Sequence, residues 1–321
     1  MHHSRRSLVA LASALAMVGA GVYACGSRTG LVVVAERDGG NVIEAGPHDA
    51  TIDSPHDAGR DVGHDADADA KFDAPAPPPI ILGQGCDASQ PNAAYFMTID
   101  EKLGTFDPET LIFSDPHKVS CPVFSTEHDP HTIAVNRAGM VFVLYNDDNI
   151  YEIDPRTYAC TSTPYKSGQM DYPNRFGMAF RWLQDGGDEL RLLSAAPSRL
   201  AIFDPVSFKY IDELGVHPDI LSIPDLQATP DGGLFAFDKT YLVGLDLDSG
   251  AMIYPDQDFP NLELGPWTFL AWRGRFILFD APGPLTTPSN IRVYDPVVMR
   301  LQMVGKYPTT IVGVAASTCL N

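Results

Sequence analysis

The sequence has few basic residues. It contains 22 Lys and Arg against 41 Asp and Glu, which gives a formal net charge of −19 over 321 residues. Proteins that bind the phosphate backbone of nucleic acids need clustered basic side chains. The composition therefore excludes nucleic-acid binding as a main role.

The sequence also lacks the common catalytic and cofactor signatures. It has no G-x-S-x-G nucleophile elbow, no P-loop, no G-x-G-x-x-G fingerprint and no C-x-x-C pair. The sequence therefore identifies no cofactor. A divalent cation stays as the one candidate, on the residues discussed below. The 27 Gly and 27 Pro residues favour many turns over long helices.

Long apolar runs are absent after the N-terminal segment. The run from Leu8 to Ala24 has 17 uncharged residues, which is short for a membrane span and typical of the core of a signal peptide. It ends at Ala24-Cys25, which resembles a bacterial lipobox, where the Cys thiol is acylated. We expect residues 1–25 to be a signal peptide with this lipobox, Cys25 to be the lipidation site, and the lipid bilayer to be a partner. Ordinary cleavage near Ala24, which leaves Cys25 free, is the alternative.

The export route stays open between two alternatives. Arg5 and Arg6 resemble a twin-arginine export motif, but the basic start of an ordinary signal peptide can hold such a pair as well. Under either route we expect the protein in the bacterial cell envelope, lipid-anchored, in the periplasm or at the outer-membrane surface.

Residues 26–83 have the composition of a tether rather than of a folded domain. They are rich in Asp, Ala, Pro and His and contain few aromatic residues. Such a segment buries too little apolar surface to offset the entropy lost on ordering, and its like charges extend the chain. We predict a disordered spacer here.

Five later segments repeat one pattern, an apolar strand followed by an acidic turn. The turn begins at an Asp that four times out of five precedes Pro, and successive anchors are 47, 50, 42 and 49 residues apart. Pro fixes φ at the first central position of a turn, and the Asp side chain accepts a hydrogen bond from the turn backbone. This repeat length is that of one four-stranded propeller blade. The anchors are Asp107, Asp154, Asp204, Asp246 and Asp295.

Residues 84–321 are therefore predicted to be all-β and to form a single β-propeller. Five four-stranded blades fit the repeats, and six blades is the alternative. Each anchor is expected between the third and fourth strands of its blade. The first repeat lacks a preceding first strand, and Ile311–Ala315 offers the missing one at the other end of the sequence. We expect this C-terminal strand to close the ring, and the protein to be a monomer.

The Asp-Pro turns and the blade length resemble those of the quinoprotein, NHL and WD-repeat-like propellers of exported bacterial proteins. The order of lipobox, Asp/Ala/Pro-rich tether and single propeller resembles that of propeller lipoproteins. This resemblance implies the fold and the anchored location. No catalytic motif comes with it.

Four cysteines remain beyond Cys25, and they allow three pairings. An exported compartment permits disulfides. In the blade assignment, Cys86 precedes blade one and Cys319 follows the closing strand. Cys121 follows the outer strand of blade one, and Cys160 lies on the outer strand of blade two. We therefore predict the disulfides Cys86–Cys319 and Cys121–Cys160.

Propeller sites normally lie at one mouth of the central channel, where the inner strands start. Arg175 and Trp267 lead two of these strands. The candidate catalytic residues are Asp129, His131, Asp225 and Glu263, since paired carboxylates can act as acid and base in glycoside cleavage. The candidate metal ligands are Glu127, His128 and His131, whose side chains suit zinc or a harder cation. A solvated loop is the alternative for this segment.

Two classes of function fit these observations. The first is a lipoprotein tethered in the periplasm or at the cell surface, which presents a rigid propeller face as a recognition or scaffold module for a protein or glycan ligand. The second is an exported hydrolase or lyase, carbohydrate-active or metal-dependent, with its site at the channel mouth. Convergence of carboxylates at the mouth would favour the second.

Overall fold

The computed structural model describes residues 93–319, except 124–128, 184–186, 196–197, 218–221, 240, 261, 263–264 and 284–286. The predicted signal peptide (1–25) and tether (26–83) lie outside these residues. The described residues belong to one compact unit, 72–321. None of the helices in this described part has the length and apolar character needed to cross a membrane.

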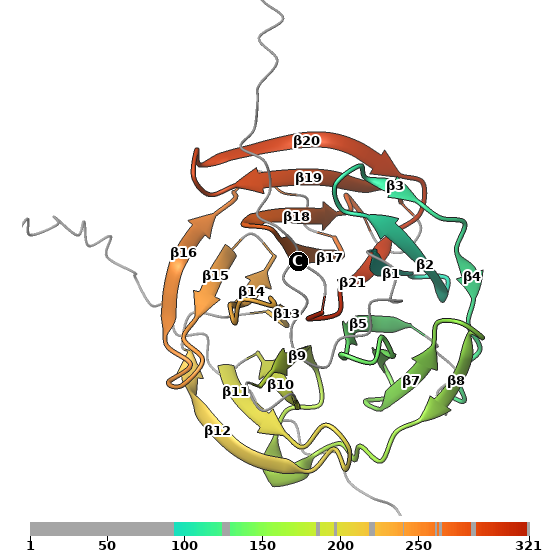
Figure 1. Cartoon of the computed structure of the whole chain (residues 1–321), viewed down its shortest axis with the longest axis vertical. Coiled ribbons are helices and arrows are strands. Elements are labelled where there is room, and N and C mark those ends of the chain that lie inside the picture. Colours follow the sequence, from blue (N-terminus) through green and yellow to red (C-terminus); the bar gives the residue numbers. More distant parts are fainter. Residues whose placement is uncertain are drawn as a thin grey trace, which may run out of the picture. The chain divides into compact units, whose positions relative to one another are not determined.

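Five antiparallel sheets are arranged in a ring as the five four-stranded blades of a β-propeller, with their first strands nearest the centre (Figure 1). Blade 1 contains β21 (Ile311–Ala315), β1 (Ala94–Thr98), β2 (Lys102–Asp107) and β3 (Ile112–Phe113), with β4 (His117–Lys118) also paired to β2. Blade 2 contains β5 (Pro130–Val135), β6 (Val141–Tyr145), β7 (Ile150–Asp154) and β8 (Ala159–Ser162). Blade 3 contains β9 (Phe176–Trp182), β10 (Asp188–Ser194), β11 (Ser198–Phe203) and β12 (Tyr210–His217).

The last two blades have the same order of strands. Blade 4 contains β13 (Asp225–Ala228), β14 (Leu234–Asp238), β15 (Tyr241–Leu245) and β16 (Met252–Asp258). Blade 5 contains β17 (Trp267–Trp272), β18 (Arg275–Asp280), β19 (Ser289–Asp295) and β20 (Arg300–Tyr307). The predicted all-β fold and the five blades are confirmed.

The ring closes between the two ends of the folded unit. Strand β21 pairs antiparallel with β1, with Tyr95 opposite Ala315 and Phe96 opposite Val314. The C-terminal strand thus becomes the inner strand of blade 1, as the missing first strand of the first repeat predicted.

Each predicted Asp turn joins the third strand of its blade to the fourth. In all five the Asp carboxylate accepts the backbone N–H two residues later, for example Glu109 N–H on Asp107 at 2.8 Å and Val297 N–H on Asp295 at 2.9 Å. The residue four positions after each Asp has positive φ, the left-handed region that favours Gly. Only one of the five is Gly; they are Leu111, Tyr158, Phe208, Gly250 and Met299.

The hydrophobic core lies between adjacent blades. Five buried clusters each join residues of two neighbours; Phe106 of blade 1, for example, meets Phe279 of blade 5 edge to face at 5.7 Å. Inner strands approach very closely around the channel. A Cβ added at Gly177 would lie 2.4 Å from Pro224 O, and one added at Gly313 would lie 2.9 Å from Ile133 N. Both glycines are therefore required by close packing of inner strands.

A disulfide joins the outer parts of blades 1 and 2. Cys121 and Cys160 are bonded with their Cα atoms 4.9 Å apart, which confirms this predicted pairing. Disulfides persist in oxidising, extracytoplasmic compartments, and the bond indicates such a location. Cys319 is buried and disulfide-bonded, but Cys86 lies outside the described residues, so the Cys86–Cys319 pairing stays a prediction.

Candidate binding site at the channel mouth

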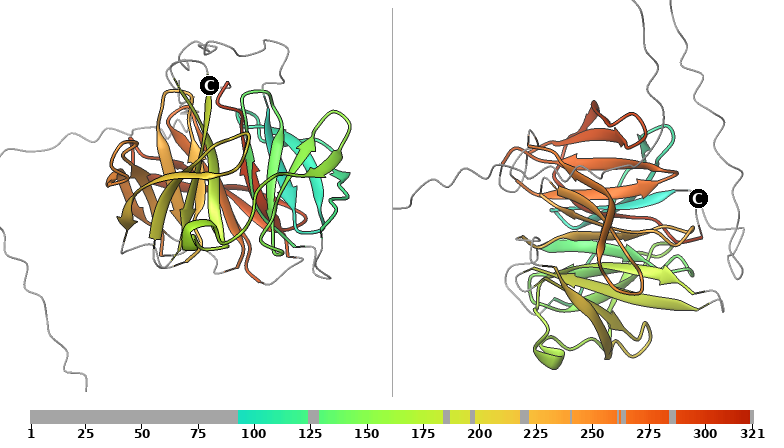
Figure 2. Two further views of the ribbon diagram at one scale, coloured as in Figure 1. Left: turned by 90° about the horizontal axis from the view of Figure 1, so that it is seen from below. Right: turned by 90° about the vertical axis from the view of Figure 1, so that its left-hand side faces the viewer.

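The inner strand of each blade runs from one face of the ring to the other (Figure 2). The starts of β5, β9, β13, β17 and β21 therefore share one end, which we call the mouth. Two cavities of about 370 Å³ and 180 Å³ open there and share the segment Asp129–His131. Asp129, His131 and Asp225, which the sequence singled out, all line the larger cavity, and Asp129 and His131 line the smaller one too.

The larger cavity has a mainly apolar lining drawn from blades 1, 2, 4 and 5. The indole of Trp267 forms part of its wall, and the Lys239 ammonium lies 5.9 Å from the centre of that ring. The remaining apolar residues of its lining are Ile99, Pro130, Ile223, Pro224, Pro266 and Val312. A cavity of this size and composition is typical of sites for small organic ligands.

Asp225 lines this cavity at the start of β13 and is 5% exposed. Its carboxylate accepts hydrogen bonds from the hydroxyl of Thr132 at 2.8 Å and from the hydroxyl of Thr268. It also accepts the backbone N–H groups of Leu226 at 3.0 Å and Phe269 at 3.3 Å. Burial raises the pKa of Asp225 to about 6, and the hydrogen bonds oppose that shift. The carboxylate thus joins blades 2, 4 and 5 across the channel.

The same network reaches the closing strand. Thr268 Oγ1 accepts the Val314 N–H at 3.1 Å, and the Gln227 side-chain amide donates to the Val314 carbonyl at 2.6 Å. Strand β21 of blade 1 is therefore fixed by polar side chains of blades 4 and 5, in addition to its pairing with β1. We call this set, Asp225, Thr132, Thr268 and Gln227, the channel network.

The smaller cavity differs from the channel network because some of its buried polar atoms make no hydrogen bond with the described residues. Its lining comes from blade 2 and from Arg175 at the start of blade 3. His131 Nε2 and Asn146 Oδ1 are buried there without a hydrogen bond to any described residue. Burial, with a smaller contribution from the charge of Arg175, lowers the pKa of His131 to about 4. The imidazole is therefore neutral at neutral pH.

The remaining candidates have no described placement. Glu127, His128 and Glu263 lie outside the described residues. Within the part of the chain that is described, no group of three His, Cys, Asp or Glu side chains could hold a metal ion. Of the three candidate metal ligands, only His131 lies within the described residues.

Two cavity residues were missed from the sequence. Asn146 follows β6 and Lys239 follows β14, so both come from the ends of second strands. In an antiparallel blade the second strand ends where the first begins. The residue after each second strand was therefore the available signal.

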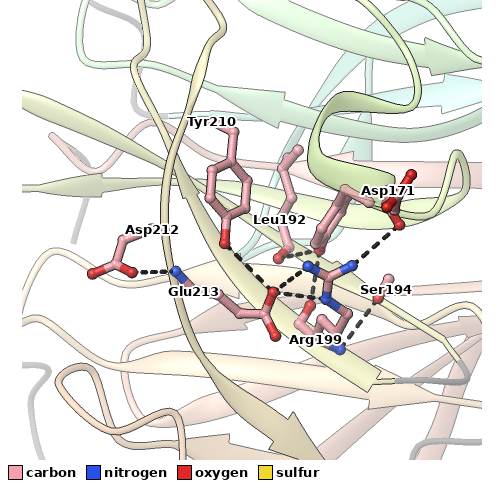
Figure 3. Close-up of polar contacts among 8 residues, drawn as sticks. Asp171, Leu192, Ser194, Arg199, Tyr210, Asp212 and Glu213 are labelled. Carbon is pink, nitrogen blue, oxygen red and sulfur yellow. Dashed lines mark hydrogen bonds and ion pairs between the residues drawn. The ribbon is translucent and has the colours of Figure 1, made fainter.

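The densest polar cluster elsewhere lies on blade 3 and is satisfied internally (Figure 3). Arg199 pairs with Glu213, donates to the Asp171 carbonyl at 3.1 Å, and its guanidinium lies 5.4 Å from the centre of the Tyr172 ring. The Tyr172 hydroxyl donates to the Leu192 and Arg199 carbonyls at 2.6 and 2.8 Å. These bonds attach the short helix η1 (Gln169–Asp171) to its blade.

No protein-family model matches the chain, and no curated protein is similar to it in sequence. Among solved structures, hydrazine synthase of Kuenenia stuttgartiensis is 14% identical, with 70% of this chain and 69% of that one covered at a TM-score of 0.37. A protein of unknown function from Bacteroides caccae is 10% identical, with 70% and 97% covered at a TM-score of 0.44. Virginiamycin B lyase of Staphylococcus aureus is 12% identical, with 67% and 68% covered at a TM-score of 0.38. Likenesses at this level carry no argument about activity.

Proposed function

We propose that this protein is a lipid-anchored protein of the bacterial cell envelope whose propeller is a recognition module, with its ligand site in the larger cavity of the mouth. The observation that carries the proposal is the lining of that cavity. Apolar residues of four blades and the indole of Trp267 surround a space of about 370 Å³. Such a surface binds an apolar group by excluding water from it.

The state of Asp225 favours recognition over acid–base catalysis. A catalytic carboxylate must reach the substrate, but this one accepts four hydrogen bonds from its own protein. The exported hydrolase or lyase, which we considered from the sequence, has no carboxylate pair free for such chemistry among the described cavity residues. The described lining therefore supports binding better than turnover.

Binding in the larger cavity is tested with the uncharged fluorescent probe N-phenyl-1-naphthylamine. We expect saturable fluorescence enhancement with the full-length chain and a loss of roughly tenfold or more in affinity for Trp267→Ala, since the indole is a large part of the apolar wall. Trp182→Ala is the matched control, because Trp182 packs under Arg137 and lines neither cavity. Equal affinities for the two variants would contradict the site.

The anchor is tested separately by Cys25→Ser. Two or more acyl chains hold a protein on a membrane stably where one does not, at about 0.8 kcal/mol per buried methylene. We expect the variant in the soluble fraction after cell lysis and the parent protein in the membrane fraction. Equal partitioning of both would refute lipidation and leave the cavity unaffected.

A further inference from the structure

The smaller cavity combines two groups of opposite charge that have no side-chain partners among the described residues. Arg175 carries a positive charge and Asp129 a negative one, and neither makes a side-chain ion pair or hydrogen bond within the described residues. The other mouth-lining acid, Asp225, belongs to the channel network. The smaller cavity therefore offers one cation and one anion to a ligand.

Two further groups in this cavity are buried and open. His131 Nε2 and Asn146 Oδ1 have no hydrogen-bond partner in the described part of the chain, although both atoms are shielded from water. Buried polar atoms are nearly always satisfied, because an unsatisfied one costs the free energy of its lost hydration. We therefore expect a bound ligand to supply hydrogen-bonding groups near these two atoms. Asn146 Oδ1 is an acceptor, so it needs an N–H or O–H donor.

The two cavities meet at the segment Asp129–His131. A ligand seated there has its polar end beside Arg175 and Asn146 and its apolar end beside Trp267. The side chains of Asp129 and Arg175 in the smaller cavity have opposite charges, and the Lys239 ammonium of the larger cavity lies near the Trp267 ring. A ligand with no net charge but with separated charges matches this arrangement, since both of its ions find a counter-charge.

Resting on the proposed function, we propose that the mouth binds a free α-amino acid with a large apolar side chain. Its carboxylate pairs with the Arg175 guanidinium, whose planar donors suit a carboxylate. Its ammonium donates to the Asp129 carboxylate and to Asn146 Oδ1. Its side chain enters the larger cavity against Trp267. This ligand class uses Arg175, Asp129 and Asn146 of the smaller cavity together with the apolar wall of the larger one.

A simple organic anion accounts for less of the site. Arg175 would hold it, but Asp129 lines both cavities and would repel it, and Asn146 Oδ1 would stay without a donor. A simple cation would pair with Asp129, but the positive charge of Arg175 would repel it. The comparison of zwitterion, anion and cation is therefore the decisive experiment.

The probes are L-phenylalanine, N-acetyl-L-phenylalanine, which lacks the ammonium, and L-phenylalaninamide, which lacks the carboxylate. Titration calorimetry with the full-length chain at about pH 6 keeps the α-amino group charged. We expect the free amino acid to bind roughly tenfold or more tightly than either analogue, because each analogue leaves one charged group of the site without its counter-charge. Tighter binding of the acetylated analogue or of the amide would overturn the zwitterion site in favour of an anion or a cation site.

Two conservative variants assign the charges. Arg175→Gln should abolish the preference for phenylalanine over its amide and keep the preference over the acetylated form. Asp129→Asn should do the reverse, while thermal melting stays unchanged in both. Binding of N-phenyl-1-naphthylamine should stay unchanged in Arg175→Gln, because Arg175 lines only the smaller cavity. If the neutral probe binds and phenylalanine does not, the amino-acid inference fails and the recognition module stands. If the neutral probe also fails to bind, the proposed function fails first.

Discussion

The channel network and the smaller cavity lie at the same end of the same propeller, and they treat buried polar groups in opposite ways. Asp225 accepts four hydrogen bonds from blades 2, 4 and 5. His131 directly precedes Thr132 in β5, and its Nε2 atom has no hydrogen-bond partner among the described residues. A buried polar group that stabilises the fold has all its hydrogen bonds supplied by the protein, because an unsatisfied donor or acceptor would lower stability.

A polar group that binds a ligand makes no hydrogen bond within the protein, so it lowers the stability of the ligand-free protein. The pKa shifts follow the same division. Burial raises the pKa of Asp225 to about 6, whereas burial and then Arg175 lower that of His131 to about 4. The difference separates stability from binding within one mouth, and substitutions can test that separation.

Asp225→Ala should have the largest effect. It removes the acceptor of two hydroxyls and two backbone N–H groups and leaves a space in the channel, so we expect a loss of about 4 kcal/mol or more in the free energy of unfolding. Chemical denaturation followed by tryptophan fluorescence measures it. A loss below about 1 kcal/mol would show that the network does not hold the blades together.

The pH dependence of stability should split in opposite directions in two variants. The native state holds the Asp225 proton up to about pH 6, but the unfolded state releases it near 3.8, so the contribution of Asp225 falls as pH rises through this window. For His131 the unfolded state holds the proton up to 6.5 and the native state only to about 4, so its contribution rises with pH.

In the parent protein the two slopes offset each other. Relative to it, Asp225→Asn should gain stability as pH rises from about 4 to 6, and His131→Leu should lose it, each by up to about 1.4 kcal/mol per pH unit. Urea denaturation at several pH values gives both differences. Slopes of the same sign in the two variants would contradict the assigned protonation states.

The two threonines of the channel network should differ in importance. Thr268 donates to Asp225 and also accepts the Val314 N–H, whereas Thr132 only donates to Asp225. We expect Thr268→Val to cost about 2 kcal/mol and Thr132→Val about 1 kcal/mol. Both are nearly isosteric, so volume is controlled, and equal costs would remove Thr268 from its bridging role.

His131→Leu should have the smallest effect at neutral pH. No hydrogen bond is lost at Nε2, and a buried unsatisfied atom is removed, so we expect a change between zero and about 1 kcal/mol of added stability. Thermal or chemical unfolding at pH 7 measures it. A loss as large as that of Asp225→Ala would show that His131 belongs to the channel network after all.

Much of the architecture was predictable because it repeats. The Asp turn recurs five times, and each copy constrains the strands on both sides of it, so blade number, strand order and ring closure followed from local patterns. The Cys121–Cys160 disulfide followed from the same alignment. The left-handed residues did not, because Leu111, Tyr158, Phe208 and Met299 stand where Gly would have been the signal.

The mouth was predictable only in outline. The sequence located polar residues at the starts of inner strands, and Asp129, His131, Arg175, Asp225 and Trp267 do line the two cavities. It could not separate Asp225 from the others. That distinction depends on Thr132 and Thr268, which are 93 and 43 residues away in sequence and converge on one carboxylate only when blades 2, 4 and 5 are assembled.

The pairing of β21 with β1 makes the order of synthesis matter. Ile311–Ala315 is made after every other strand of the ring, yet it is the inner strand of the blade that is made first. A chain that stops before Ile311 leaves β1 with an open edge and the channel network without Val314. Only a chain that includes Ile311–Ala315 can therefore close the ring, and a shorter product keeps an unpaired strand edge with which another chain can pair.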